Sequence, residues 1–123
     1  MAYTFKDIKV WQKAYELVLE IYRFTRVFPD SERYGLTAQI RRASVSIATN
    51  IVEGYKRKSK KDFVHFLNMA DSSLEETKYQ LLLAMDLAYM TKIEYDRFSI
   101  LTDEVGRMLH GFQKSLELTT YSL

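Results

Sequence analysis

The side chains best suited to chemistry in this sequence are two histidines, a set of carboxylates and a cluster of lysines and arginines. His65 and His110 are the only histidines, and the chain contains no cysteine. A zinc site built on a helix needs ligand spacing such as H-E-x-x-H, which does not occur here. A di-iron bundle needs Glu-x-x-His pairs, and the sequence has none. The sequence therefore predicts no metal ion and no other cofactor.

The sequence patterns of common enzyme sites are missing as well. No Ser/His/Asp arrangement, phosphate-binding P-loop or Gly-rich dinucleotide fingerprint can be assembled from these residues. We therefore expect no catalytic residues, no small-molecule substrate and no enzymatic activity.

Positive charge is concentrated in residues 33–61. This segment carries eight Lys and Arg residues against Glu53 alone, whereas residues 1–32 have no net charge and residues 62–123 are net negative by five. Clustered Lys and Arg form the electrostatic footprint of nucleic-acid binding. The candidate nucleic-acid-binding residues are Arg42, Lys56, Arg57, Lys58, Lys60 and Lys61. Nothing in the segment encodes base readout, so we expect binding to RNA or DNA to depend on charge or shape.

Other interpretations of this basic segment stay open. A solvated loop that aids solubility fits the same residues, and so does a loop that docks an acidic protein partner. Tyr34 and Tyr55 flank the segment and are candidates for stacking on bases. Asn50 and Glu53 could face a ligand, or could satisfy backbone groups and pair with arginines across helices.

Four amphipathic stretches must position these residues. We expect a first helix from about residue 7 to 25 and a second from just after Gly35 to a C-terminal cap at Gly54. A third helix should run from the Ser59–Asp62 cap to about residue 90, and a fourth should begin at a Thr91–Glu94 capping box. One Pro and four Gly are too few for an all-β chain. The predicted fold is all-α, an antiparallel up-down four-helix bundle with a single domain over residues 1–123.

The apolar faces of these helices are wider than one bundle core requires. The first two cover an arc of roughly 200°, whereas a stripe somewhat over 100° is enough to cover one neighbour. From Tyr79 onward the third helix is apolar on nearly every side. We therefore expect a homo-oligomer with the following interface residues: Arg41, Tyr79, Leu82, Leu83 and Leu87. Arg41 lies inside an apolar arc and should meet a carboxylate or an interface rim, whereas Arg42 should face solvent.

The sequence favours a cytoplasmic protein without membrane contact. The absence of cysteine fits a reducing compartment. The N-terminus has no apolar signal region, and the longest aliphatic run, Leu81 to Met85, is far too short to span a bilayer.

Several short motifs resemble the 23S ribosomal RNA intervening-sequence protein family. They are Tyr34-Gly35-Leu36, Gln39-Ile40-Arg41-Arg42-Ala43, Ser46-Ile47, Asn50-Ile51, Glu53-Gly54, Phe63 and Ser73-Leu74-x-Glu76, with Phe5-Lys6-Asp7, Val10-Trp11 and Phe28-Pro29 before them. The resemblance covers nearly the whole chain. Ala48 and Ser72 depart from it, because the family often has Pro and Gly at these positions.

The resemblance implies a four-helix bundle that assembles as a ring-like homopentamer. It also implies kinship with the accessory variability determinant proteins of diversity-generating retroelements, which are basic pentamers that bind nucleic acid. The number five comes from this resemblance alone.

Overall fold

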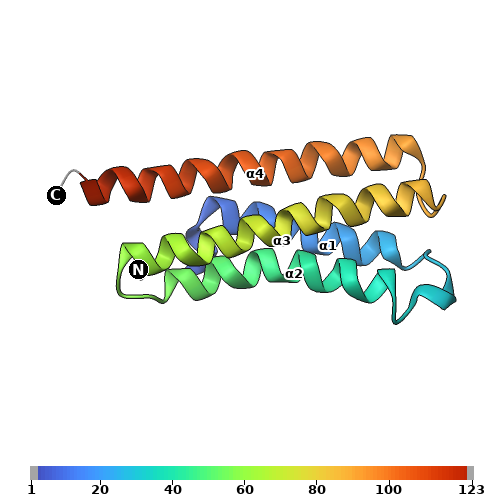
Figure 1. Ribbon diagram of the computed structural model, residues 1–123, viewed down its shortest axis with the longest axis horizontal. Helices are drawn as coiled ribbons and strands as arrows, with labels where there is room; N and C mark the ends of the chain where they lie inside the picture. Colours follow the sequence, from blue (N-terminus) through green and yellow to red (C-terminus); the bar gives the residue numbers. More distant parts are fainter. Residues whose placement is uncertain (1–2, 122–123) are drawn as a thin grey trace.

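The computed structural model describes residues 3–121 and is built from four long helices. These are α1 (Lys9–Thr25), α2 (Leu36–Tyr55), α3 (Lys60–Asp86) and α4 (Lys92–Tyr121), with short 3-10 turns at Phe5–Asp7 and Asp30–Glu32. Consecutive helices run in opposite directions along the long axis (Figure 1). The predicted all-α four-helix bundle is confirmed.

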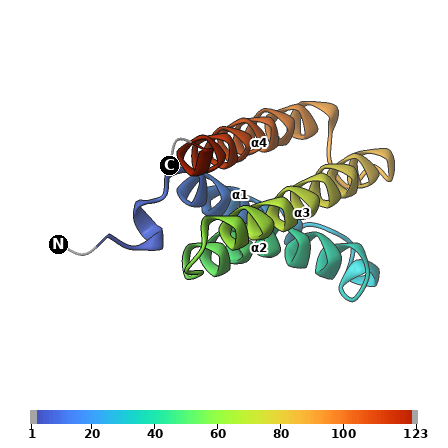
Figure 2. The same ribbon diagram turned by 60° about the vertical axis from the view of Figure 1, so that its left-hand side comes forward.

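The helices form a closed square of neighbours. Each helix packs against the next one along the chain, and α1 also packs against α4. Figure 2 shows α2 and α4 on opposite sides of the bundle. The α2–α3 and α3–α4 connections are four and five residues long, which favours antiparallel packing of these helices. The α1–α2 connection has ten residues and contains the turn Asp30–Glu32.

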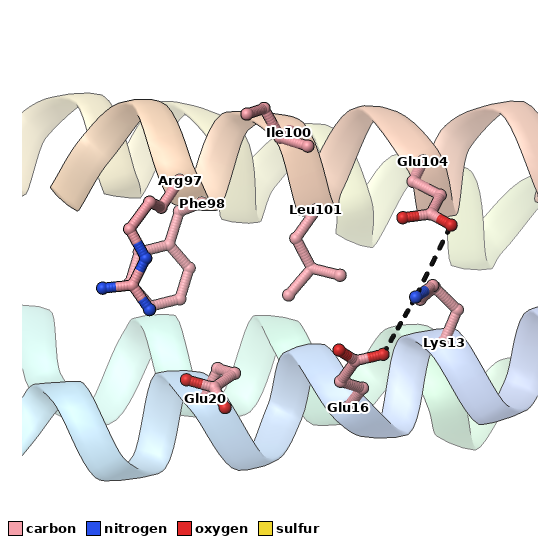
Figure 3. Close-up of a pocket in the computed structure, with 8 residues that line it drawn as sticks. All are labelled: Lys13, Glu16, Glu20, Arg97, Phe98, Ile100, Leu101 and Glu104. Carbon is pink, nitrogen blue, oxygen red and sulfur yellow. Dashed lines mark hydrogen bonds and ion pairs between the residues drawn. The ribbon is translucent and has the colours of Figure 1, made fainter. Parts of the chain in front are cut away.

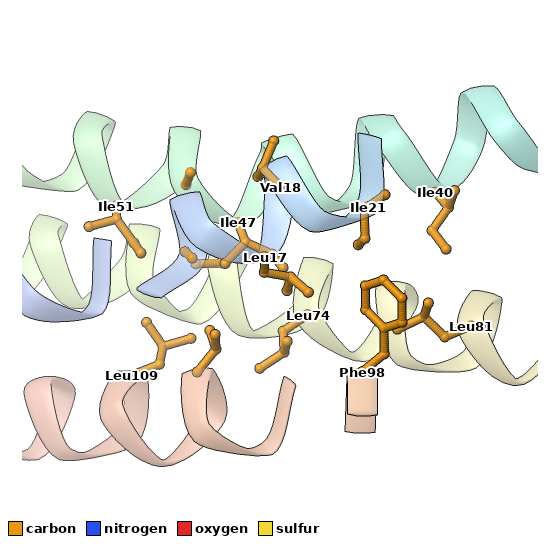
Figure 4. Close-up of a cluster of buried hydrophobic side chains, with 14 of the residues drawn as sticks. Leu17, Val18, Ile21, Ile40, Ile47, Ile51, Leu74, Leu81, Phe98 and Leu109 are labelled. Carbon is orange, nitrogen blue, oxygen red and sulfur yellow. The ribbon is translucent and has the colours of Figure 1, made fainter. Parts of the chain in front are cut away.

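The core runs through the centre of the bundle and draws on all four helices (Figure 4). Its largest fully buried aliphatic side chains are Leu17, Ile21, Ile40, Ile47, Ile51, Leu67, Leu74, Val105 and Leu109. Burying each such side chain contributes about 1.5–3 kcal/mol. This apolar contact fixes the helix faces and therefore decides which side chains are left at the surface.

Two predicted helix starts are confirmed by their caps. The Ser59 hydroxyl accepts a hydrogen bond from the Asp62 N–H at 3.1 Å, which begins α3. At the start of α4, the Glu94 N–H donates to Thr91 Oγ1 at 3.1 Å and the Thr91 N–H donates to Glu94 Oε1 at 2.7 Å. This reciprocal pair is the expected capping box.

Gly54 is not the helix cap that the sequence suggested. It lies inside α2, which continues to Tyr55, and it is buried. A Cβ added at Gly54 would lie 2.7 Å from Phe63 Cδ1 and 3.0 Å from Phe66 Cβ. Glycine is therefore needed for the close approach of α2 to α3 rather than for a left-handed backbone conformation.

Two other helix ends differ from the expected positions. Thr4 and Asp7 form their own capping box around the first 3-10 turn, so α1 begins only at Lys9. The third helix ends at Asp86, before Ala88, which adopts a left-handed φ of 64°.

Glu32 joins the α1–α2 connection to the α3–α4 connection. Its Oε1 accepts from the Leu36 N–H at 3.0 Å, and its Oε2 accepts from the Tyr89 hydroxyl at 2.9 Å. The hydrogen bond from Leu36, and then the one from Tyr89, lower the pKa of Glu32. The same bond to Glu32 raises the pKa of Tyr89. One carboxylate thus holds two loops together at this end of the bundle.

Candidate nucleic-acid interface

The basic loop, residues 56–61, reverses the chain between α2 and α3 at one end of the bundle (Figure 1). The N–H of Lys56 donates to Val52 O at 3.3 Å, and the N–H of Arg57 donates to Gly54 O at 3.0 Å. These bonds end α2, and Ser59 then starts α3 two residues later. The six residues of the basic loop therefore include the C-cap of α2, the turn and the start of α3.

Four lysines of the basic loop have free ammonium groups. Lys56, Lys58 and Lys61 are exposed and Lys60 is partly exposed. No residue in the part of the chain that the structure describes forms a hydrogen bond or ion pair with these four side chains. Lys60 and Lys61 also occupy the first turn of α3, where the helix dipole is positive. The loop is therefore a concentrated positive surface that an anion can neutralise.

Arg57 behaves differently from the lysines beside it. Its guanidinium lies over the Phe66 ring, 4.5 Å from the centroid, and one of its nitrogens is 3.8 Å from Glu53 Oε2. The basic loop therefore contacts an aromatic side chain of the bundle through Arg57. A cation held over an aromatic face also stabilises the fold, so Arg57 is not purely a surface charge.

The structure separates Arg42 from the basic loop. Arg42 is exposed on α2, fourteen residues before Lys56, so the helix rise places them about 21 Å apart along the axis. Arg42 instead lines a small pocket of about 160 Å³ between α2 and α3, together with Gln39, Ser46 and Glu76. The basic residues of segment 33–61 therefore do not form one surface. Exposure of Arg42 to solvent agrees with the helix-wheel prediction.

Arg41 lies against the C-terminal end of α1. Its Nε donates to Thr25 Oγ1 at 2.8 Å, its Nη2 donates to Tyr22 O at 3.4 Å, and its guanidinium lies 4.7 Å from the Tyr22 ring centroid. The expected carboxylate partner is not found among the described residues; a hydroxyl, a carbonyl and an aromatic face take its place. No sequence pattern indicated this role for Thr25 or Tyr22. Arg41 is half-buried at the rim of the α1–α2 face, and its part in an oligomer interface stays a prediction.

The two candidate stacking tyrosines differ in their surroundings. Tyr34 is 88% exposed, with Arg33 near its ring. Tyr55 is half-buried, and its hydroxyl donates to Tyr3 O at 2.8 Å. Tyr34 is the freer of the two, but it lies at the opposite end of α2 from the basic loop.

The two polar residues at the end of α2 contact residues one turn away along the chain. Asn50 Nδ2 donates to Ser46 O at 2.9 Å, which is the backbone role that we considered for it. Glu53 contacts Arg57, one turn further along the chain, rather than an arginine across helices.

The predicted interface residues on α3 are exposed in the single chain. Tyr79 is 55% exposed, and Leu82, Leu83 and Leu87 are each at least 40% exposed. Such a contiguous run of large apolar side chains on a monomer is typical of an interaction surface. Whether a second copy covers it stays a prediction.

A groove of about 310 Å³ with a mixed polar and apolar lining lies between α1 and α4 (Figure 3). Lys13 bridges Glu16 at 3.1 Å and Glu104 at 3.5 Å. The hydrogen bond to Glu16 is the main cause of a raised pKa for Lys13, with a further contribution from Glu104. These ion pairs account for the polar groups in this part of the groove.

Two further observations concern metal ions and membranes. Across residues 3–121, no group of three or more His, Asp or Glu side chains is arranged to hold a metal ion. Within the same range, none of the helices is long and apolar enough to cross a membrane.

Comparisons with known proteins bear on the whole chain. No curated protein matches the sequence significantly. A solved structure of a protein of unknown function from the S23 ribosomal protein family of Bacteroides thetaiotaomicron is similar, with a TM-score of 0.78 and 27% sequence identity. The match covers 85% of this chain and 95% of that one. A family model described as 23S rRNA-intervening sequence protein matches residues 6–111. This chain therefore belongs to the 23S rRNA-intervening sequence protein family.

Proposed function

We propose that this protein is a non-enzymatic homo-oligomer that binds RNA or DNA without sequence preference through its basic loop. The observation that carries the proposal is the set of four lysines with no partner in the described chain, Lys56, Lys58, Lys60 and Lys61. Free ammonium groups contact phosphates and release condensed counterions. The two other polar side chains of the loop are engaged within the fold, Arg57 over Phe66 and Ser59 as the cap of α3, so charge governs the contact.

The position of Lys60 and Lys61 supports an anionic partner. Cations in the first turn of a helix are disfavoured by the dipole, by about 0.3–1 kcal/mol each near the surface. Asp62 is the only acidic residue in that turn of α3. A phosphate bound here would relieve the repulsion and would also face the N-terminal N–H groups of the helix.

Assembly would increase the number of basic loops that one nucleic-acid strand can contact. The exposed apolar residues of α3 support a homo-oligomer, and the family resemblance implies five copies. A single basic loop binds weakly, but several loops on one assembly would bind one polymer by avidity.

The decisive experiment measures RNA and DNA binding of the wild type and of a variant in which the four lysines are replaced by Gln. Arg57 is kept, because its contact with Phe66 belongs to the fold. We expect wild-type affinity to fall steeply with salt, with a log–log slope near −0.7 per phosphate neutralised on single strands. The variant should lose binding while its helicity and oligomer mass stay unchanged.

A control variant separates the effect of the basic loop on binding from the effect of net charge. It removes four exposed positive charges elsewhere, by replacing Arg26, Arg33, Arg97 and Arg107 with Gln. Both variants drop from a formal charge of +2 to −2, so only the location of the charge differs. Equal loss of binding in the two variants would rule out the loop as the site. A wild type that binds no nucleic acid at low salt would leave the alternative function, a scaffold whose basic loop docks an acidic protein.

A further inference from the structure

The described chain carries two separate apolar surfaces on different helices. The first is a groove of about 330 Å³ between α1 and α2, which we call the α1/α2 groove. Its lining is almost entirely apolar and consists of Phe5, Trp11, Tyr15, Val18, Val45, Ala48, Thr49, Val52 and Glu53. The second, which we call the α3 ridge, is formed by Tyr79, Leu82, Leu83 and Leu87.

These two surfaces have complementary shapes. The α1/α2 groove is a hollow between two helices, with the rings of Trp11 and Tyr15 stacked 5.0 Å apart along one wall. The α3 ridge is a row of protruding side chains on one helix. From Tyr79 to Leu87 the ridge extends about 12 Å, and the α2 wall of the groove, from Val45 to Val52, extends about 10 Å. The ridge thus spans the whole length of the groove and reaches slightly beyond it.

Each surface also ends in a charge that has no opposite charge beside it. Arg41 lies one turn before Val45 and contacts only neutral groups, Thr25 and Tyr22. Asp86 is exposed between Leu83 and Leu87, and no described residue forms an ion pair with it. If Asp86 of one copy lies beside Arg41 of another, Tyr79 of the first copy lies toward Val52 of the second. The α3 helix of the first copy then runs antiparallel to the α2 helix of the second.

We propose that the α3 ridge of one copy lies in the α1/α2 groove of the next, with Asp86 paired to Arg41. This inference rests on the homo-oligomer proposed above and specifies how it assembles. The two surfaces belong to different helices, so the contact is head-to-tail and each copy uses its groove for one neighbour and its ridge for another. Repetition of such a contact closes a ring when the rotation between copies permits it.

Complementing variants test this arrangement directly. Val45→Glu places a charge in the α1/α2 groove, and Leu83→Glu places one on the α3 ridge; both positions are already 37–40% exposed. In a head-to-tail oligomer each variant alone loses every interface and should be monomeric by native mass spectrometry. A mixture retains one intact groove and one intact ridge, so it should form a one-to-one dimer that cannot grow further.

Three other results of this experiment would each contradict the proposed contact. A wild type that is monomeric would contradict the assembly itself, and with it this inference. If the wild type assembles but each variant alone still forms dimers, the two surfaces pair with themselves and the head-to-tail contact is wrong. A mixture that stays monomeric would also overturn it. Because one variant could fold poorly, Tyr15→Glu and Tyr79→Glu provide a second pair, and circular dichroism checks the helicity of all four.

A double-mutant cycle tests the charge pair. Arg41→Gln and Asp86→Asn should each weaken assembly roughly tenfold if the pair is desolvated at the interface. The double variant should then be no weaker than either single variant, because both remove the same interaction. Effects that multiply in the double variant would show that Arg41 and Asp86 do not meet. Arg42→Gln serves as the control and should leave the dissociation constant unchanged.

Discussion

At the residue scale, Ala88 occupies a backbone position that glycine adopts more readily. Its φ is 64°, in the left-handed region. The Tyr89 N–H donates to Ala84 O and the Ala88 N–H donates to Met85 O, both at 2.9 Å. This pair of bonds is the Schellman motif, in which the left-handed residue is usually Gly. An alanine here costs about 1 kcal/mol relative to Gly.

We therefore expect Ala88→Gly to stabilise the protein by about 1 kcal/mol, a rise in Tm of about 3–5 °C. The comparison needs equal protein concentrations, since assembly raises the apparent stability. Ser72→Gly, at an exposed position inside α3, is the matched control. It should lower Tm, because Gly is disfavoured in a helix interior. A decrease in both variants would show that Ala88 is not strained.

Glu32 makes stability depend on pH. Its folded-state pKa lies below the ordinary 4.5, because Leu36 and Tyr89 donate hydrogen bonds to its charged form. Its stabilising contribution is therefore complete above about pH 4.5 and is lost as pH falls through the lowered folded-state pKa. Glu32→Gln should be less stable than the wild type at pH 7, and the difference should shrink below pH 4.5.

Urea unfolding at several pH values between 3 and 7 measures this difference. Tyr89→Phe removes one of the two hydrogen bonds and should retain part of the pH dependence. A difference between wild type and Glu32→Gln that stays constant over this range would mean that the pKa of Glu32 is not lowered by folding.

At the element scale, the close contact of α2 with α3 depends on Gly54. A methyl group at this position would meet the Phe63 ring at 2.7 Å and Phe66 Cβ at 3.0 Å. Separating the helices to make room costs about 1–3 kcal/mol. Phe66 also supports Arg57, so the same displacement would disturb the basic loop. We therefore expect Gly54→Ala to lower both Tm and nucleic-acid affinity.

Gly111 provides a matched control within α4. A Cβ added there meets nothing within 4 Å, so Gly111→Ala should raise stability by up to about 1 kcal/mol through helix propensity. Opposite signs for the two Gly→Ala substitutions in a thermal melt would support the packing role of Gly54. A neutral or stabilising Gly54→Ala would contradict it.

The elements themselves could be predicted well from the sequence, because capping residues and apolar periodicity are local signals. Ser59, Thr91 and Glu94 marked two helix starts within a residue of their positions. Gly54 was misjudged, because a glycine that ends a helix and a glycine that admits a neighbouring ring look alike in one sequence. Only the position of Phe63 distinguishes the two roles.

The candidate site was predicted less accurately, for two physical reasons. Counting charge over residues 33–61 grouped Arg42 with Lys56, although the α2 helix, which rises about 1.5 Å per residue, separates the two side chains. The environment of Arg41 depends on how α1 packs against α2, and periodicity carries no information about which carbonyl or hydroxyl lies opposite. The helix wheel did place Arg41 inside the apolar arc of its helix and Arg42 toward solvent, and in the structure the apolar side that Arg41 faces is α1.

At the scale of the whole molecule, the proposed assembly and the proposed nucleic-acid binding would be linked by geometry. Each copy would present one basic loop, with four free lysines, at one end of the bundle. A head-to-tail ring places all copies in the same orientation, so the loops would gather on one face of the ring. A polymer long enough to reach several loops then binds through effective concentration rather than through any additional type of contact.

The last prediction follows from that linkage. A monomeric ridge variant such as Leu83→Glu keeps its basic loop intact, so its affinity for an oligonucleotide too short to bridge two loops should equal that of the wild type. For a long single strand, the wild type should bind at least 10²-fold more tightly than the variant, because avidity is lost with the assembly. Filter binding with a series of strand lengths, at one fixed salt concentration, measures both quantities. An equal loss at every length would mean that Leu83→Glu damages the loop itself, and an unchanged affinity for long strands would mean that a single loop supplies all of the binding.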